Sequence, residues 1–152
     1  MKALIQKVSS SSVSVNEKII SSIGKGLLIF LGVGKFDTIN DASKLAKKCC
    51  QLRIFEDENN KMNRSLIDVS GEIMIISQFT LYADIIKGLR PSFELAAPPE
   101  NAEPLYQKFI AECKLIIESE KVKTGIFREM MKVSLVNDGP ITILVESETM
   151  KI

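Results

Sequence analysis

The sequence predicts a single α+β domain in which a curved, barrel-like β-sheet, mixed or largely antiparallel, is accompanied by two main helices. The length of 152 residues fits one hydrophobic core, and 45% hydrophobic with 26% charged residues is close to the globular average. Segments of β-forming composition outnumber helical segments and do not alternate regularly with them, which favours an α+β arrangement. We therefore expect one domain over residues 1–152.

The chain opens with segments that predict a hairpin and a buried strand. Residues 3–8 and 13–15 are rich in β-formers, and residues 16–17 predict a turn into the next strand. The serine run at residues 9–12 is interpreted as a solvent-facing strand edge. Residues 27–33 then form a continuous apolar run bounded by glycines, which is typical of a buried strand.

The first main helix should follow this strand. Either Asp37 or Thr38 can cap it. One stripe at helical spacing carries four apolar side chains, Ala42, Leu45, Ala46 and Cys49. We therefore expect Cys49 in the core rather than in the chemistry. A short strand at residues 53–55 and a polar turn at residues 56–60 come next.

The second half of the chain predicts one more buried strand, a second main helix and two final strands. The strand is expected at residues 72–79, and apolar residues repeat at helical spacing over residues 101–118. A long irregular stretch between them is marked by Pro91, Pro98 and Pro99. Residues 131–136 and 141–145 are β-rich and are separated by the turn-forming residues 137–140.

The composition restricts the chemistry that the protein can perform. The chain contains no histidine, which removes Ser-His-Asp and Cys-His arrangements. With three cysteines and no histidine, most zinc sites are excluded as well, so we expect no metal and no cofactor. A net charge of +1 argues against a broad nucleic-acid-binding surface, but it allows a local basic patch.

The same composition bears on the compartment. No run approaches the ~20 apolar residues that span a bilayer, and residues 1–10 lack the apolar stretch of a signal peptide. Three cysteines, two of them adjacent, form no spaced disulfide framework. We therefore expect a cytoplasmic protein with free thiols and no contact with a membrane.

Two segments place polar groups where a strand pattern predicts apolar ones. At residues 75–82 a buried strand delivers Ser77, Gln78 and Thr80 at its end, where site residues are common. These groups could equally satisfy the local backbone. At residues 136–142 a Gly-Pro pair permits unusual backbone angles and a cis bond, although spacing alone favours an ordinary turn. The residues themselves leave both alternatives open.

The two segments resemble the signature motifs of the D-aminoacyl-tRNA deacylase family. The motifs are SQFTLYAD at residues 77–84 and NDGPITI at residues 137–143. Further similar segments are MKALIQKVSSSSVSV at 1–15, IGKGLLIFLGV at 23–33, RIFEDENNKMN at 53–63, GLRPSFELAAPPE at 88–100, TGIF at 124–127 and MKVSLVNDGP at 131–140. The similarity covers essentially the whole chain in the order expected of the family.

This resemblance implies a homodimer that hydrolyses the ester joining a D-amino acid to the 3′ end of a tRNA. It places four residues at the bound 3′-terminal adenosine and the ester: Ser77, Gln78, Phe79 and Thr80. It also implies that the Gly139-Pro140 bond is cis, enters the active site of the partner subunit and excludes L-amino acids sterically. The other substrate-binding residues that it implies are Asn137, Lys7 and Met131. Glycine is achiral and has no side chain to be excluded sterically, so glycyl-tRNA is a further expected substrate.

The position of Thr80 makes its hydroxyl a candidate nucleophile, but no base is evident for it. We therefore expect attack by water, assisted by the 2′-hydroxyl of the RNA, with backbone N–H groups near Phe79 and Thr80 stabilising the oxyanion. The alternative is a non-catalytic module of the same fold that binds the tRNA acceptor end. A plain scaffold protein explains the two motifs least well.

The chain departs from the family pattern at two places. Lys7 stands where arginine is common, which keeps the charge but loses the planar, bidentate fork. Arg128 and Glu129 replace small residues next to Met130 and Met131. We therefore expect the contacts at the site entrance and the shape of the gate near the pocket to differ from those of the family.

Overall fold

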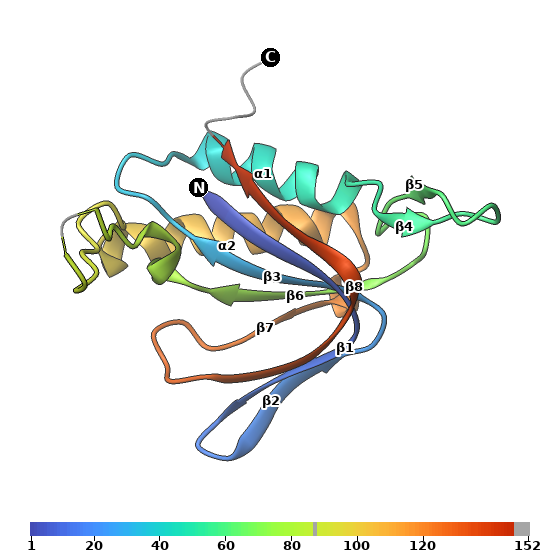
Figure 1. Ribbon diagram of the computed structural model, residues 1–152, viewed down its shortest axis with the longest axis horizontal. Helices are drawn as coiled ribbons and strands as arrows, with labels where there is room; N and C mark the ends of the chain where they lie inside the picture. The colour runs from blue at the N-terminus through green and yellow to red at the C-terminus, as the bar shows by residue number, and fades with distance from the viewer. Residues whose placement is uncertain (87, 148–152) are drawn as a thin grey trace.

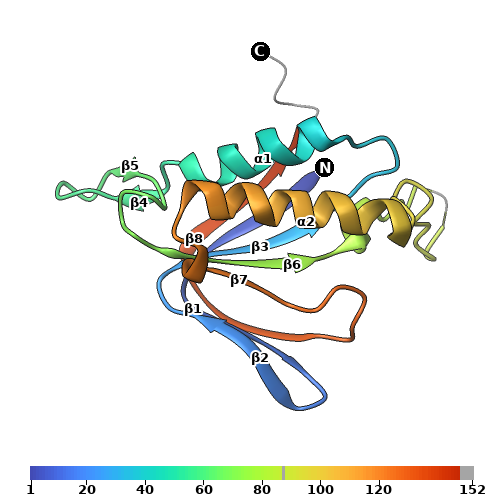
Figure 2. The ribbon, with the colours of Figure 1, turned by 180° about the vertical axis from the view of Figure 1, so that it is seen from behind.

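The computed structural model describes residues 1–86 and 88–147, which form two layers: a strongly curved sheet and a pair of helices on one of its faces (Figure 1). The sheet contains β1 (Lys2–Val15), β2 (Lys18–Ile23), β3 (Gly26–Gly32), β6 (Glu72–Ser77), β7 (Val122–Thr124) and β8 (Lys132–Glu146). The helices are α1 (Ile39–Gln51) and α2 (Pro99–Ile116), which lie side by side over the sheet in both views (Figures 1 and 2). The predicted α+β class with two main helices is confirmed.

The sheet is mixed. Its order is β2-β1-β3-β6-β7, and β8 pairs with the other side of β1. The pairs β3–β6 and β6–β7 are parallel, whereas β1 is antiparallel to each of its partners. Each parallel pair needs a crossover, and α1 and α2 lie on these two connections. A separate hairpin consists of β4 (Phe55–Glu56) and β5 (Met62–Arg64).

Both faces of the sheet are packed. Beneath the helices, a large core contains side chains from all the central elements, among them Ile5, Leu27, Ile73, Leu45 and Phe109. On the inner side of the curve, a smaller core contains Val8, Val13, Ile23, Leu28, Met74 and Ile76. Successive strand residues point to opposite faces, so Leu27 and Leu28 serve different cores. This is why residues 27–33 are apolar without interruption.

The N-terminus of α1 settles which residue caps the helix. Thr38 is the N-cap: its side chain accepts from the Asp41 amide, and the Asp41 carboxylate accepts from the Thr38 amide at 2.8 Å. Asp37 instead accepts a hydrogen bond from the Tyr82 hydroxyl at 3.2 Å. The predicted apolar stripe of α1 is buried, and Cys49, Cys50 and Cys113 are buried free thiols. Among the described residues, no helix combines the length and apolarity needed to cross a membrane.

The serine run was predicted at a solvent-facing strand edge, and this prediction is correct for the exposure of Ser9 and Ser10 but wrong for the paired residues Ser11 and Ser12. Residues 9–12 lie inside β1, which has β8 on one side and β3 followed by β2 on the other. Ser11 is buried, and its hydroxyl donates to the Ser134 carbonyl at 3.0 Å. The small side chains therefore serve a paired strand, although Ser9 and Ser10 are exposed.

The final two strands were predicted as separate, with a turn at residues 137–140, and this prediction is also wrong. Residues 132–146 form one strand, β8, which pairs with β1 on both sides of the interruption. Between the pairs Gln6–Thr142 and Val8–Asn137, β8 has three more residues than β1. The turn-like sequence is thus accommodated as a large bulge, because pairing with β1 resumes beyond it.

Candidate active site

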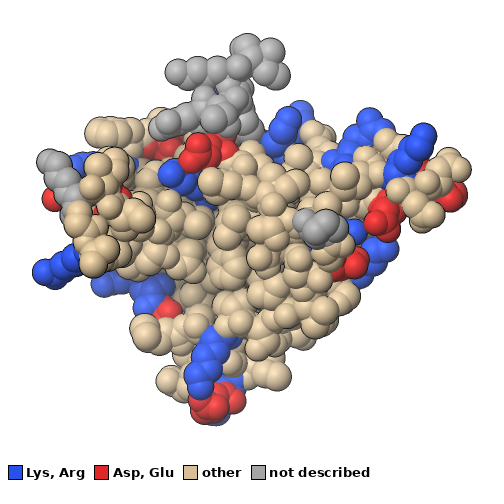
Figure 3. All heavy atoms as spheres, in the orientation of Figure 1, with Lys and Arg blue, Asp and Glu red and all other residues tan. Residues whose placement is uncertain are grey.

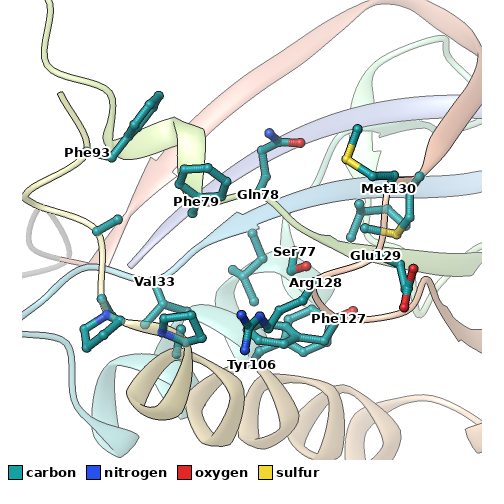
Figure 4. A pocket seen from close by; sticks show the side chains of 18 of the residues that line it. Val33, Ser77, Gln78, Phe79, Phe93, Tyr106, Phe127, Arg128, Glu129 and Met130 are labelled. Carbon is teal, nitrogen blue, oxygen red and sulfur yellow. The ribbon is translucent and has the colours of Figure 1, made fainter. Parts of the chain in front are cut away.

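A cavity of about 590 Å³ opens at the ends of β3 and β6, between the sheet and the N-terminal part of α2 (Figure 4). Its walls are mostly apolar and aromatic. The lining residues include Leu31, Val33, Ile76, Phe79, Phe93, Tyr106, Phe127, Met130, Met131 and Val133, with Ser77, Gln78, Arg128 and Glu129 adding polar groups. Such a concave, mainly apolar site with a few polar groups is typical of small-ligand binding.

One wall of the cavity is the end of β6 and the 3₁₀ turn η1 (Phe79–Tyr82) that follows it. Ser77 still pairs with Leu31, and the Gln78 amide donates to the Leu31 carbonyl at 2.8 Å. The chain then turns, so the predicted strand over residues 72–79 ends at Ser77. The side-chain amide of Gln78 donates to the Thr80 hydroxyl, which brings two motif residues together.

The Phe79 ring stands at the mouth of this wall. It remains 57% exposed and meets the Phe93 ring edge-on, with 5.0 Å between the ring centroids. The two rings lie on the same side of the cavity (Figure 4). An exposed aromatic pair at a cavity mouth offers a surface on which a base or another planar group can stack.

Tyr106 of α2 forms the floor. Its hydroxyl donates to the Ile75 carbonyl at 2.8 Å, and its ring lies 5.6 Å from that of Phe127. Burial raises the pKa of the Tyr106 phenol well above its usual range, so this hydroxyl stays protonated. Tyr106 therefore acts as a fixed donor that holds α2 against β6.

The opposite wall is the loop between β7 and β8. Gly125 permits close packing there, because a Cβ at this position would lie 2.4 Å from the Met131 sulfur. Met131 is thereby held against the sheet, where it packs on the inner core. Arg128 follows with a left-handed backbone, at φ 66°.

The bulge of β8 lies outside this cavity and is held by side chains. The Asn137 side-chain amide donates to the carbonyls of Lys7 and Ile141, both at 3.0 Å, and so spans the base of the bulge. The Lys7 side chain is only 5% exposed, and its ammonium lies 3.6 Å from the Asp138 carboxylate and 3.8 Å from that of Glu56. A buried cation between two more exposed carboxylates thus links the β4–β5 hairpin to the bulge.

The predicted site residues therefore fall into two groups. Four of them line the cavity or its mouth: Ser77, Gln78, Phe79 and Met131. Thr80 follows directly with an exposed side chain. Lys7, Asn137 and Gly139 lie at the bulge, and the side chain of Pro140 lies outside the described part of the structure. Within the described ranges, no group of three or more His, Cys, Asp or Glu residues is placed to hold a metal ion.

Sequence reasoning missed the contributions of Tyr106 and Phe93 to the cavity. Tyr106 lies within the helical repeat predicted at residues 101–118, and Phe93 lies in the irregular stretch before it. A buried tyrosine needs a partner for its hydroxyl, which was the available signal for Tyr106. Nothing in the local sequence around Phe93 indicates that its ring meets Phe79.

Comparison with known proteins assigns the chain to a family. The family model described as D-Tyr-tRNA(Tyr) deacylase matches residues 4–146, and the chain belongs to this family. It is 53% identical over 148 residues to the D-aminoacyl-tRNA deacylase of Syntrophus aciditrophicus (strain SB), covering 97% of this chain and 98% of the relative. It is 51% identical over 148 residues, with the same coverage, to the protein of that name from Thermosipho africanus (strain TCF52B). The family predicted from the motifs is confirmed.

Two solved structures share the fold. The one named c-Myc DNA Unwinding Element Binding Protein superposes with a TM-score of 0.92 at 40% identity, covering 96% of this chain and 98% of its own. A probable eukaryotic D-amino acid tRNA deacylase gives a TM-score of 0.84 at 16% identity, covering 95% of this chain and 98% of its own, and shows the fold alone.

Proposed function

We propose that the protein hydrolyses the ester bond of D-aminoacyl-tRNA, releasing the free D-amino acid and the tRNA. The observation that carries this proposal is the cavity, one wall of which is formed by residues 77–79, the segment that resembles a signature motif of the family. Its volume and its aromatic mouth suit an aminoacylated terminal nucleoside. Because aminoacyl-tRNA is consumed in translation, we propose that the protein acts in the cytoplasm.

Water is the proposed nucleophile. The Thr80 hydroxyl accepts a hydrogen bond from Gln78, and among the described residues no carboxylate or lysine contacts it to take its proton. Phe79 and Thr80 open a 3₁₀ turn, where the first backbone N–H groups lack acceptors within the turn. These N–H groups suit a developing oxyanion, while the 2′-hydroxyl of the terminal ribose assists the attack. Water adds its oxygen to the acyl carbon, and the ribose oxygen leaves with a proton.

The chirality test is proposed to come from a second copy of the chain. In one chain, the Gly139 bulge is absent from the residues that line the cavity, and Asn137, Asp138 and Gly139 are all exposed. A homodimer in which the cis Gly139-Pro140 segment enters the partner's cavity would bring the two motifs together. Its backbone would exclude the side chain of an L-amino acid and accept a D-amino acid or glycine. Glycyl-tRNA is then a further substrate.

The surface around β8 is compatible with such a dimer. Val136 and Leu144, both on β8, are 58% and 52% exposed. The Gln6 side-chain oxygen, on the neighbouring strand, is buried without a hydrogen-bond partner in the described structure. The face of the molecule seen in Figure 3 is largely uncharged at its centre, and Lys, Arg, Asp and Glu gather around its rim. An uncharged patch with a charged rim is the usual anatomy of a protein interface.

The deciding experiment compares hydrolysis of D-Tyr-tRNA and L-Tyr-tRNA by the purified protein, with a chelator present. We expect hydrolysis of the D-ester alone, and we expect it to survive both the chelator and Thr80→Ala. Gly139→Ala should weaken rejection of the L-ester, because a Cβ there alters the bulge that tests handedness. Loss of activity in Thr80→Ala alone would make Thr80 the nucleophile. Binding of tRNA without hydrolysis of either ester would favour the non-catalytic module instead.

A further inference from the structure

Arg128 adopts a backbone conformation that is costly for its residue type. Its φ of 66° lies in the left-handed region, which non-glycine residues rarely occupy. The other described non-glycine residues with positive φ are Asn16, Glu17, Asn60 and Ser70, none of which lines the cavity. Arg128 therefore combines local strain with a position on the cavity wall.

The Arg128 side chain lines the cavity, as do Tyr106 and Phe127, whereas the neighbouring Glu129 points in another direction (Figure 4). Within residues 1–86 and 88–147, the guanidinium has no ion pair, hydrogen bond or cation–π contact. A guanidinium is a permanent cation with five N–H donors. The mainly apolar cavity thus has at its edge an exposed cation without a protein partner among the described residues.

We infer that Arg128 binds an oxyanion of the substrate, either a phosphodiester near the 3′ end of the tRNA or the side-chain carboxylate of an acidic D-amino acid. This inference rests on the proposed deacylase function, because it assumes that the acceptor end enters the cavity. Both groups match the planar fork of arginine, which can donate two parallel hydrogen bonds to one oxyanion. Arg128 is a binding residue on the wall opposite Ser77 and Gln78, so it holds the substrate without touching the ester.

The test uses Arg128→Gly and Arg128→Lys in the full chain. Glycine adopts a left-handed backbone without strain, so Arg128→Gly should fold as well as the unmodified protein, and its thermal midpoint verifies this. Arg128→Lys keeps the charge without the fork. The matched control is Lys44→Ala, which removes one positive charge from the exposed side of α1, away from the cavity.

If the oxyanion is a phosphodiester, we expect Arg128→Gly with D-Tyr-tRNA as the substrate to raise KM about tenfold and to leave kcat within about twofold, because such a contact binds the ground state and the transition state equally. The slope of log(kcat/KM) against log[salt] should become shallower by about 0.7, the value for one single-strand phosphate contact. Arg128→Lys should keep the salt slope and recover only part of the KM. Lys44→Ala should change neither quantity.

D-Asp-tRNA distinguishes the two sources of the oxyanion. A phosphodiester contact predicts equal losses for D-Tyr-tRNA and D-Asp-tRNA, whereas a carboxylate contact predicts a loss with D-Asp-tRNA alone. Unchanged KM and salt slope for both substrates in a folded Arg128→Gly protein would overturn the inference. If the unmodified protein hydrolyses neither ester, the deacylase function fails. In that case we compare the affinities of the unmodified and Arg128→Gly proteins for uncharged tRNA. Equal affinities would overturn the proposed phosphate contact.

Discussion

The two signature segments are held in place by different forces. The first, at the end of β6, is fixed by the backbone: Ser77 pairs with Leu31, and the Gln78 amide donates to the carbonyl of Leu31. A Cβ on Gly32 would lie 3.1 Å from the Gln78 carbonyl oxygen, so the backbones of these two segments are in close contact there. This wall of the cavity is part of the sheet itself.

The second segment, the bulge of β8, leaves the sheet and is held by side chains. The Asn137 amide spans its base, and the buried Lys7 ammonium lies between the carboxylates of Asp138 and Glu56. A substitution that displaces the wall should therefore also destabilise the fold, whereas a substitution can displace the bulge and leave the fold stable. Stability and activity should change together in the first segment and separately in the second.

The largest loss of stability is expected from Gly26→Ala, which disrupts the β3–β6 pairing that supports the wall. Gly26 lies opposite Glu72 at the start of β3 and β6, and a Cβ there would lie 1.8 Å from the Glu72 carbonyl oxygen. Because this obstacle is backbone, the strands must separate, and we expect a loss of about 3 kcal/mol or more in the free energy of unfolding. Urea unfolding measures this loss, and deacylation should fall in parallel.

Gly24→Ala is the matched control for this change. The nearest atom to its Cβ would be a carboxylate oxygen of Glu72 at 3.3 Å, at the flexible end of a side chain. Its urea midpoint should stay close to that of the unmodified protein. Equal midpoints for the two alanine variants would contradict the claim that close β3–β6 pairing holds the wall.

Lys7→Met should separate activity from stability. Methionine keeps an apolar stem and removes the buried charge, and the carboxylates of Glu56 and Asp138 are exposed enough for water to solvate them. The free energy of unfolding should therefore change little. Displacing the bulge by about 1 Å can cost about 100-fold in rate, so we expect a loss of that order in kcat/KM for D-Tyr-tRNA.

Lys7→Arg is the control for charge, because arginine restores the cation and adds a bidentate fork. We expect it to keep the activity of the unmodified protein or to exceed it. Full activity in a folded Lys7→Met protein would show that the ion cluster does not position the bulge.

The contrast between the two segments also explains which parts of the fold and of the site could be predicted from the sequence. The stripe at Ala42, Leu45, Ala46 and Cys49 and the run at residues 27–33 follow from local periodicity, and all of these elements were predicted correctly. The polar residues within 77–80 were likewise predicted at the end of an apolar strand, although that strand, β6, ends at Ser77 and not at residue 79. Local patterns are sufficient where the backbone itself fixes the segment.

The bulge and the cavity depend on contacts between distant residues, which local patterns do not contain. Residues 137–140 have the composition of a turn, yet pairing of Thr142 with Gln6 continues β8 beyond them. The same holds for Phe93, which meets Phe79 only after the intervening loop folds back. Periodicity predicts elements, whereas register and cavity walls are decided by tertiary pairing.

Asn137→Ala should have an intermediate effect. It removes two hydrogen bonds, to the carbonyls of Lys7 and Ile141, from an exposed side chain. Water can replace them, so we expect a loss of only about 1 kcal/mol in the free energy of unfolding. Discrimination between D-Tyr-tRNA and L-Tyr-tRNA should decline more clearly than stability. Asn137→Asp, which keeps the shape of the side chain but loses its N–H donor, should behave in the same way. If both variants still discriminate between the two esters, the hydrogen bonds of Asn137 do not position the bulge.

The smallest effect concerns the β4–β5 hairpin, which presents Glu56 to Lys7. Hydrogen bonds from the Asn63 side chain and from the amides of Lys61 and Asn59 hold the pKa of Asp57 below its usual range. A carboxyl whose pKa is lower in the folded chain stabilises it above the unfolded value, about 3.9, and loses this contribution as the pH falls through the folded value. Hairpin amides should therefore keep their protection from exchange between pH 7 and about 5 and lose part of it below about pH 4.

In Asp57→Asn this extra loss of protection at low pH should vanish, and its persistence would assign the effect to another carboxyl. Because Glu56 lies in this hairpin, loosening it should reach the bulge of β8 before it reaches the wall at β6.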